Sequence, residues 1–484
     1  MTQINPLGSN NSINLKPLTI EDLEEHNPDS IFECFDSDKS GTISDEEIRT
    51  QGFVGEMFDK AKEKLIQMFG ELFIGDIKDE DGFFRYDSEQ PEIQVAHTIK
   101  DIPTGSHKGV RDARGYDISG LNLSRKELLD LCIDKTTVLS AEQKAIINEV
   151  SEKAKDPGLS VRDLHKQGFT GKGVRMAIID QPIGRHKEYD SRIVKNVDIN
   201  TKDVKGWNVA SMHAAAVTSI AAGKSVGVAP EAEVEFYSAV NISNGSKEVQ
   251  EWKKNVYEEM KKDPNSKQWF MEKLNMFGKN ECPSNRPYVE AINRILDNNE
   301  KAPDNEKVSV ISISWGFDRL APGYDDLIKA VERAKKQGVF IVSTALDEHY
   351  GFQTSGANRN PDGDLNNPEN YEAGAFYKEY SETFDEQTKK ELLLVPMDHR
   401  TVADFTDGES YRYEGNDGGM SWSTPWLAGM YVLAKQADPD ITPENFWKIA
   451  LEQSDECNNN DTGTNVGRII NPQKLINEIL RQKK

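Results

Sequence analysis

The sequence has few cysteines, few basic residues for its acidic content and no long apolar run, and each shortage argues against a class of protein. Its four cysteines, at positions 34, 132, 282 and 457, are widely spaced, so we expect free thiols rather than a disulfide framework or a metal cluster. Lys and Arg number 59 against 82 Asp and Glu, which gives a formal net charge of -23. We therefore expect no nucleic-acid partner, because no basic excess is available to neutralise phosphates.

The chain also lacks the segments that direct a protein to or through a membrane. No stretch approaches the ~20 apolar residues that span a bilayer. Residues 1–15 are polar and lack the basic segment followed by an apolar one of a secretory signal. We therefore expect no membrane partner and a cytoplasmic location, with export by another route left open. The 484 residues leave room for two or three domains, and the oligomeric state stays open.

An acidic segment near the N-terminus matches the EF-hand calcium loop position by position. Residues 36–47 read Asp-Ser-Asp-Lys-Ser-Gly-Thr-Ile-Ser-Asp-Glu-Glu and follow an apolar helical pattern. The resemblance implies Ca²⁺ as a cofactor, with oxygen ligands from Asp36, Asp38, Ser40, Thr42 (through its carbonyl), Ser44 and Glu47. Serine at the fifth position brings less charge than aspartate and predicts a weaker site. The alternative is an acidic loop that binds nothing.

A second calcium loop is not apparent, and the N-terminal domain ends near residue 157. Residues 76–82 are acidic, but the twelve-residue register fails, so they are read as a turn or a degenerate partner loop. Residues 98–120 read as loop, and two helices with capping boxes are expected to follow, opened by Ser124 and Ser140. The break at Asp156-Pro157-Gly158 predicts a mainly helical N-terminal domain over 1–157 and a second domain over 158–484.

The second domain alternates apolar strands with helices. Apolar runs end at Asp180, Val240, Ser314 and Ala345, and helical patterns lie between them, over 288–296 and 325–337. This alternation predicts an α/β fold with a parallel sheet covered by helices on both faces. In such sheets the functional residues gather at the carboxyl ends of the strands.

Three residues with the chemistry of nucleophilic catalysis occur in the order Asp, His, Ser. Asp180 ends a buried strand, His213 precedes an alanine-rich helical stretch, and Ser421 lies in Gly-Met-Ser-Trp-Ser-Thr-Pro at 419–425. Taken singly, an aspartate at a strand end or a histidine before a helix is more often structural. Together, these segments and the closing Gly…Ile-Asn around 467–471 resemble the subtilisin-like serine peptidases (subtilases, peptidase family S8).

This resemblance covers residues ~160–480 and implies a role for each residue. Ser421 would attack a peptide carbonyl, His213 would act as general base and acid, and Asp180 would orient the imidazole. The segment Ser314-Trp315-Gly316 resembles the strand of the family that pairs with an extended peptide substrate. The insertions over 241–284 and 351–391 are expected to border or cover the cleft.

Two departures from the family pattern bear on activity. Ala214–Ala216 replace the family's Gly-Thr-His after the histidine, which changes the packing around it. Asp347 stands where subtilases have an asparagine whose amide stabilises the oxyanion. An ionised carboxylate only accepts hydrogen bonds, and loss of this donor costs roughly 10²–10³-fold in turnover. A protonated Asp347 would still donate.

The sequence thus predicts a serine endopeptidase that acts on protein or peptide substrates, with calcium bound at the N-terminal EF-hand. By its position alone, the domain over 1–157 is a candidate regulatory domain or inhibitory pro-region. The alternative is a catalytically weak or inactive subtilase-like pseudopeptidase that serves as a calcium-responsive binding module. A third reading is a calcium sensor whose N-terminal domain binds partners.

Overall fold

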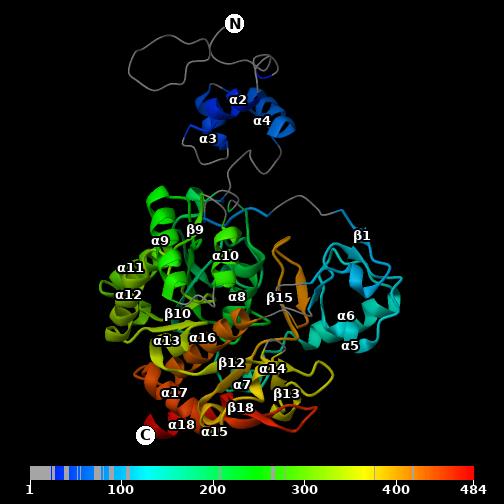
Figure 1. Ribbon diagram of the computed structural model, residues 1–484, viewed down its shortest axis with the longest axis vertical. Helices are drawn as coiled ribbons and strands as arrows, with labels where there is room; N and C mark the ends of the chain where they lie inside the picture. Colours follow the sequence, from blue (N-terminus) through cyan, green and yellow to red (C-terminus); the bar gives the residue numbers. More distant parts are fainter. Residues whose placement is uncertain are drawn as a thin grey trace.

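The structure is a computed structural model that describes most of the chain. The described residues are 23, 28–37, 43–51, 53–54, 56–69, 78–79, 81–86, 92–104, 110–204, 207, 209–262, 267–277, 280–374, 377–416 and 419–483. A group of N-terminal helices comes first along the chain. Two larger bodies follow: the region that contains α5 (Arg125–Leu129) and α6 (Ala141–Lys153), and the second domain (Figure 1). No described helix is long and apolar enough to cross a membrane.

A five-stranded parallel sheet forms the centre of the second domain, in the order β11-β10-β5-β7-β6. Its strands are β5 (Arg175–Asp180), β6 (Ile193–Asp198), β7 (Glu233–Ser238), β10 (Val308–Ile313) and β11 (Phe340–Ser343). Strands such as β5 and β10 are almost continuously apolar because both of their faces are covered. The predicted parallel sheet is confirmed.

Helices pack on both faces of this sheet, and β5 shows how the sequence sorts its side chains between them. Met176 and Ile178 face the core of α8 (Met212–Ala222) and α16 (Met420–Ala437). Ala177 and Ile179 face α11 (Arg286–Asn299) and α12 (Tyr324–Lys336). Successive side chains of a strand point to opposite faces, so one apolar run serves two cores. Ala214–Ala216 are buried on α8, where small side chains let it approach α16.

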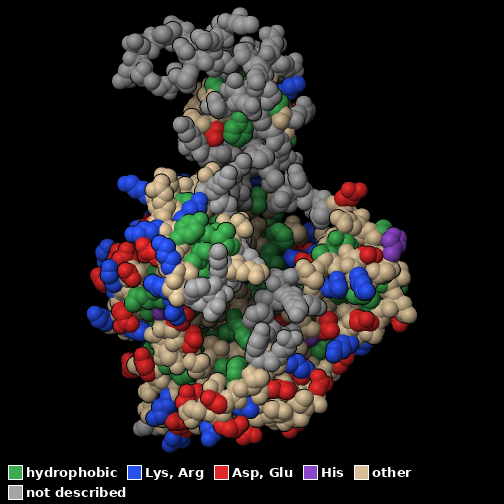
Figure 2. Space-filling model, in the orientation of Figure 1, with side chains coloured by type: hydrophobic (Ala, Val, Ile, Leu, Met, Phe, Trp, Pro, Cys, Tyr) green, Lys and Arg blue, Asp and Glu red, His purple; other side chains and the backbone are tan. Residues whose placement is uncertain are grey.

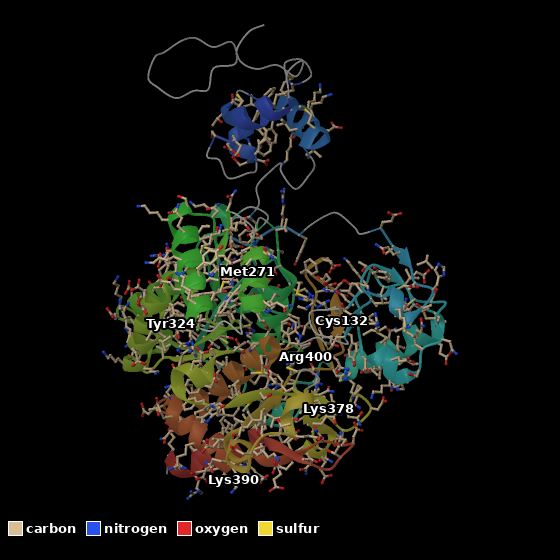
Figure 3. All side chains as sticks on the ribbon, viewed as in Figure 1. Cys132, Met271, Tyr324, Lys378, Lys390 and Arg400 are labelled. Atoms are coloured by element: carbon tan, nitrogen blue, oxygen red, sulfur yellow. The ribbon has the colours of Figure 1, made fainter. Side chains whose placement is uncertain are left out.

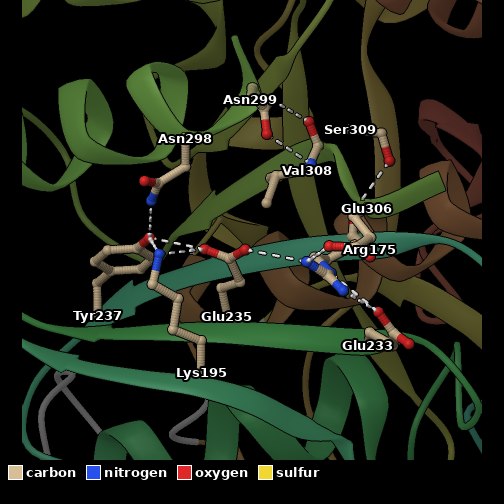
Figure 4. Close-up of polar contacts among 10 residues, drawn as sticks. All are labelled: Arg175, Lys195, Glu233, Glu235, Tyr237, Asn298, Asn299, Glu306, Val308 and Ser309. Atoms are coloured by element: carbon tan, nitrogen blue, oxygen red, sulfur yellow. Dashed lines mark hydrogen bonds and ion pairs between the residues drawn. The ribbon is translucent and has the colours of Figure 1, made fainter. Parts of the chain in front are cut away.

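The strand β5 begins in a network of charges at the opposite edge of the sheet from Asp180. Arg175 Nη2 lies 2.7 Å from Glu233, and Nη1 lies 3.6 Å from Glu235 (Figure 4). Glu235 also accepts from the Tyr237 hydroxyl at 2.8 Å, and Lys195 Nζ lies 3.4 Å from it. Arg175 and Lys195 therefore compensate the negative charge of the largely buried Glu235 carboxylate. The network connects the strands β5, β6 and β7.

A second, mixed sheet lies in the lower part of Figure 1, in the order β13-β12-β14-β18-β17. Its strands are β12 (Thr354–Arg359), β13 (Tyr371–Ala373), β14 (Leu393–Pro396), β17 (Asp455–Asn458) and β18 (Asn465–Ile469). The outer strands β13 and β17 run antiparallel to their neighbours. Around it lie α7 (Val161–Lys166), α17 (Pro443–Glu452) and α18 (Pro472–Lys483).

The two predicted insertions are ordered elements. The first consists of α9 (Ser246–Lys262) and α10 (Lys267–Met276), which β8 (Ile242–Ser243) and β9 (Cys282–Pro283) close at its base. Apolar side chains gather over α9 and α10 on the face seen in Figure 2. The second contributes β12 and β13 to the mixed sheet and adds α14 (Lys378–Ser381) and α15 (Glu386–Glu391). This second insertion is therefore part of the fold's framework, because it supplies two of the five strands of the mixed sheet.

The region before residue 158 forms two separate apolar clusters. The first joins α2 (Pro28–Phe35), α3 (Asp45–Thr50) and α4 (Glu56–Phe69). The second, which we call the α5–α6 module (residues 92–155), contains α5 (Arg125–Leu129), α6 (Ala141–Lys153), β1 (Gln94–Val95), β2 (Arg111–Asp112), β3 (Tyr116–Asp117) and β4 (Leu131–Cys132). The predicted capping boxes at Ser124 and Ser140 are confirmed. The stretch 98–120, expected to be loop, holds β2 and β3, which are too short to leave a periodic pattern.

The α5–α6 module packs on a hairpin of the second domain. Strands β15 (Arg400–Ala403) and β16 (Tyr411–Glu414) form this hairpin, which lies beside the module in Figure 1. Residue Tyr413 of β16 belongs to the module's own apolar cluster. In the sequence α16 is the next element after β16, so the hairpin links the module to the helix that carries Ser421.

Candidate active site

Asp180 is placed by the strand that precedes it. It is the last residue of β5, and only 5% of its surface is exposed. Its Oδ1 accepts a hydrogen bond from the Gln181 backbone at 2.8 Å and lies 2.8 Å from His213 Nδ1. A buried carboxylate that is held in this way fixes the orientation of the imidazole.

His213 begins α8, where the cap of the helix holds its backbone. The Ser211 side chain caps the helix and accepts from the His213 amide at 3.1 Å. The imidazole is partly exposed, and its ring centroid lies 5.3 Å from that of Trp422. Because Nδ1 contacts Asp180, the other ring nitrogen, Nε2, is the one that can exchange a proton with a substrate or a nucleophile.

Ser421 lies in the first turn of α16, next to the end of β10. Gly419 precedes the helix with φ 56° and ψ -179°, a conformation that only glycine adopts readily. The Ser314 hydroxyl donates to the Ser421 carbonyl at 2.8 Å, and the Ser421 hydroxyl donates to the Ser314 carbonyl at 3.4 Å. These contacts fasten the start of α16 to the carboxyl end of the central sheet, and Trp422 in turn packs on His213.

The predicted substrate strand ends in exposed residues. Ser314 is buried, whereas Trp315 is 41% exposed and Gly316 is exposed. Beyond them opens a cavity of about 500 Å³ whose wall is completed by Phe270 and Phe277 from the first insertion. The sequence indicates that the first insertion borders or covers the cleft, but it does not show which of the insertion's aromatic residues line this cavity.

Asp347 is the second residue of α13 (Leu346–Tyr350) and is exposed. Its neighbour Leu346 lines the same small gap as Met420 of α16, so the two helices begin side by side.

The described part of the calcium loop centres on Glu47, which is 8% exposed. Its Oε1 accepts from the Ser37 backbone at 2.6 Å and hydroxyl at 2.8 Å, and its Oε2 accepts from the Ser44 backbone at 3.0 Å. The carboxylate thus joins the two ends of the loop. Asp36 and Ser44 are partly exposed, and Asp38, Ser40 and Thr42 lie outside the described residues. Within the described part of the chain, no three His, Cys, Asp or Glu side chains are grouped to hold a metal ion.

The acidic segment at 76–82 forms a turn where it is described. The Gly82 amide donates to the Asp79 carbonyl at 3.0 Å, and the carboxylates of Asp79 and Asp81 bind Arg185. The residues that follow lie between the segment after β5 and the segment before α8. The Phe84 amide donates to the carbonyl of residue 183, and the carbonyl of residue 85 accepts from the Ala210 amide, both at 2.8 Å. These acidic side chains are therefore engaged with the second domain.

Residues 171–467 match the model of the subtilase family, peptidase S8. The chain belongs to the subtilase family. Family membership indicates a serine peptidase, a hydrolase that acts on proteins or peptides. The matched range lies within the ~160–480 expected from the sequence, so the subtilase-like α/β domain is confirmed.

Several solved structures are similar to the chain at low identity. The prenylagaramide maturation protease PagA is 13% identical with a TM-score of 0.40 and covers 66% of this subtilase and 98% of its own chain. The A subunit of the AB5 toxin from E. coli is 12% identical with a TM-score of 0.42, over 67% and 98% of the two chains. Fervidolysin from Fervidobacterium pennivorans is 13% identical with a TM-score of 0.42, over 68% and 45%. No curated protein matches the chain.

Proposed function

We propose that this subtilase is a serine endopeptidase that hydrolyses peptide bonds through Asp180, His213 and Ser421. The observation that carries the proposal is the 2.8 Å contact between Asp180 at the end of β5 and His213 at the start of α8. Ser421 joins them at the same edge of the sheet, because its helix is fastened to the end of β10.

The reaction follows from this arrangement. Ser421 Oγ attacks the carbonyl carbon of the substrate while His213 Nε2 takes the hydroxyl proton, and Asp180 stabilises the imidazolium that forms. For this step the Ser421 hydroxyl turns away from the Ser314 carbonyl toward His213. The imidazolium then protonates the leaving amine, and water releases the acyl group by the same steps in reverse.

The oxyanion of the tetrahedral intermediate needs hydrogen-bond donors. The first turn of α16 offers the Ser421 backbone N–H at the positive end of the helix dipole. Asp347, exposed at the start of the neighbouring α13, offers a carboxylate that accepts. We therefore propose a slow peptidase. Asp347 also favours a second candidate function, a pseudopeptidase that binds peptides without cleaving them.

Substrate would lie along the segment after β10. Exposed Trp315 and Gly316 offer backbone groups to an extended peptide, which would pair with them as an added strand. Trp315 also lines the cavity that Phe270 and Phe277 complete. An unfolded protein such as casein provides extended segments and is a suitable first substrate.

Cleavage of casein by the purified chain tests the proposal. Ser421→Ala should abolish cleavage because it removes the nucleophile. Ser423→Ala is the matched control: its buried hydroxyl, on the same helix, donates to the Val395 carbonyl at 3.2 Å. Cleavage that survives Ser421→Ala would exclude this serine as the nucleophile. Casein binding without cleavage by any form would favour the pseudopeptidase.

Calcium binding at Asp36–Glu47 is the second part of the proposal. Its support is the buried Glu47 carboxylate, which reaches both Ser37 and Ser44 and thus lies where a twelfth-position ligand is needed. Asp36 and Ser44 would supply further oxygens, with Asp38, Ser40 and Thr42 completing the set. Bound calcium would draw the carboxylate away from its hydrogen bonds to the loop and stabilise α2 and α3. Calorimetric titration with CaCl₂ tests this, and absence of heat at millimolar calcium would contradict it.

A further inference from the structure

We propose that the α5–α6 module positions the nucleophile, with Asp130 as the positioning residue that acts on Ser421 through Asn416. This inference rests on the proposed function of Ser421. It gives the module a supporting role in catalysis, whereas its place in the sequence suggested an inhibitory one.

The module pairs with the β15–β16 hairpin through an antiparallel bridge between Ile133 and Tyr413. The Ile133 amide donates to the Tyr413 carbonyl at 2.9 Å, and the Tyr413 amide donates to the Ile133 carbonyl at 2.8 Å. The side chain of Tyr413 is buried in the module's apolar cluster. Strand β16 therefore packs with the module although it belongs to the second domain in sequence.

The contact continues along the chain toward Ser421. Gly415 lies against the module's backbone, since a Cβ atom there would lie 2.5 Å from the Asp130 carbonyl carbon and 2.7 Å from the Leu129 oxygen. The next residue, Asn416, donates from its side chain to Asp130 Oδ1 at 2.7 Å. Ser421 follows Asn416 by five residues. Asp130 thus fixes the last described residue before the Gly419 turn that opens α16.

A chain of contacts, first polar and then aromatic, leads from the module to His213 as well. Cys132, which lies beside β15 in Figure 3, donates from Sγ to Glu414 at 3.2 Å. Glu414 forms a buried ion pair with Arg412, whose guanidinium lies 6.0 Å from the Trp422 ring. Trp422 packs on His213. Trp422 belongs to α16, the helix that carries Ser421, and its ring lies beside His213. The placement of β16 therefore affects both Ser421 and His213.

The module is also anchored at a second place, on the segment 359–362 of the second domain. Arg125 donates to Asp362 at 2.7 and 2.9 Å. Arg359 is buried and donates to the backbone carbonyls of Ala154 and Asp156, at 3.3 and 2.7 Å. Loss of the Asp130 contact should therefore leave the module docked. The Arg125–Asp362 pair provides a matched control, since it joins the same two bodies without touching the nucleophile segment.

The test compares three full-length variants. In Asp130→Ala the Asn416 side chain loses its acceptor, and we expect kcat to fall about tenfold or more with KM unchanged, because small misplacements of reacting groups are costly. Asp130→Asn should retain most of the rate, because its amide oxygen can still accept. Asp362→Ala should leave kcat unchanged. Equal kcat in Asp130→Ala and wild type would overturn the inference.

Two further readouts separate this inference from the proposed function. Asn416→Ala breaks the same contact from the other side, so the double variant should lose no more kcat than either single variant. Hydrogen exchange of the segment 411–421 should be faster in Asp130→Ala than in Asp362→Ala. If the wild type is inactive, the proposed function fails, and the exchange measurement alone decides: equal exchange in the two variants would overturn the inference.

Discussion

The buried histidine at the module interface should make the stability of this protein sensitive to acid. His399 is 4% exposed, its Nδ1 lies 2.9 Å from the Tyr413 hydroxyl, and its amide donates to the Gly415 carbonyl at 2.7 Å. Burial lowers the pKa of His399 to about 3, and the nearby cation of Arg359 contributes in the same direction.

The other groups that face His399 shift its pKa in opposite directions. A hydrogen bond to the Leu129 backbone and the charge of Asp362 raise its pKa, and the charge of Lys126 lowers it. The carboxylate of Asp130 lies 3.8 Å from Nε2. Desolvation remains the largest influence, so the folded protein keeps this imidazole neutral well below the pH at which an exposed histidine is protonated.

The size and the sign of the effect on stability follow from the difference between the pKa of His399 in the folded and the unfolded protein. The pKa in the unfolded chain is near the reference value of 6.5, and in the folded protein it is about 3. Below pH ~6.5 the unfolded state binds a proton that the folded state excludes, so stability is present above that pH and is lost as the pH falls toward 3. At ~1.4 kcal/mol per pH unit, the loss over the whole window is about 5 kcal/mol.

Denaturant unfolding between pH 4 and pH 8 measures this contribution. Below pH ~6.5, His399→Asn should remove about 1.4 kcal/mol per pH unit from the slope of the unfolding free energy against pH; above that pH the slope should not change. Asparagine is chosen because His399 has φ 51°, a conformation that asparagine tolerates. The exposed His97 provides the control, and His97→Asn should leave the slope unchanged. Equal slopes for wild type and His399→Asn would refute the reasoning.

Three further outcomes are expected from the proposed function. Asp180→Asn should lower kcat by about 10⁴-fold while the protein stays folded, because the imidazole loses its orienting carboxylate; a small effect in a casein assay would contradict the triad. Asp347→Asn should raise kcat by one to two orders of magnitude by returning an oxyanion donor, whereas the neighbouring Glu348→Gln, which removes the same charge, should not; equal effects would mean that charge alone matters. Glu47→Gln should weaken calcium binding at least tenfold in a calorimetric titration, and unchanged affinity would place the ion elsewhere.

The sequence predicted the second domain well because local patterns determine its elements. Apolar runs such as 175–180 are buried on both faces, and the capping boxes at Ser124 and Ser140 begin helices as expected. The juxtaposition of Asp180 and His213 follows from the rule that functional residues gather at the carboxyl ends of parallel strands. Their order and setting in the sequence were therefore sufficient to place them together.

Long-range pairing accounts for what the sequence did not predict. The pairing of Ile133 with Tyr413 joins residues that are 280 positions apart, and no local pattern indicates it. The same holds for the aromatic wall that α10 places beside Trp315. The single N-terminal domain over 1–157 was an inference from the break at Asp156–Gly158, and hydrophobic spacing could not reveal that its helices form two separate clusters.

Labelling with a fluorophosphonate probe tests the central claim most directly, since the probe reacts with an activated serine and needs no knowledge of the substrate. We expect stoichiometric labelling of the full-length protein at Ser421, lost in Ser421→Ala and kept in Ser423→Ala. Labelling should slow sharply in His213→Ala, because the base that activates the hydroxyl is gone. No labelling of the folded protein at any pH from 5 to 9, with or without calcium, would contradict the account and favour the pseudopeptidase.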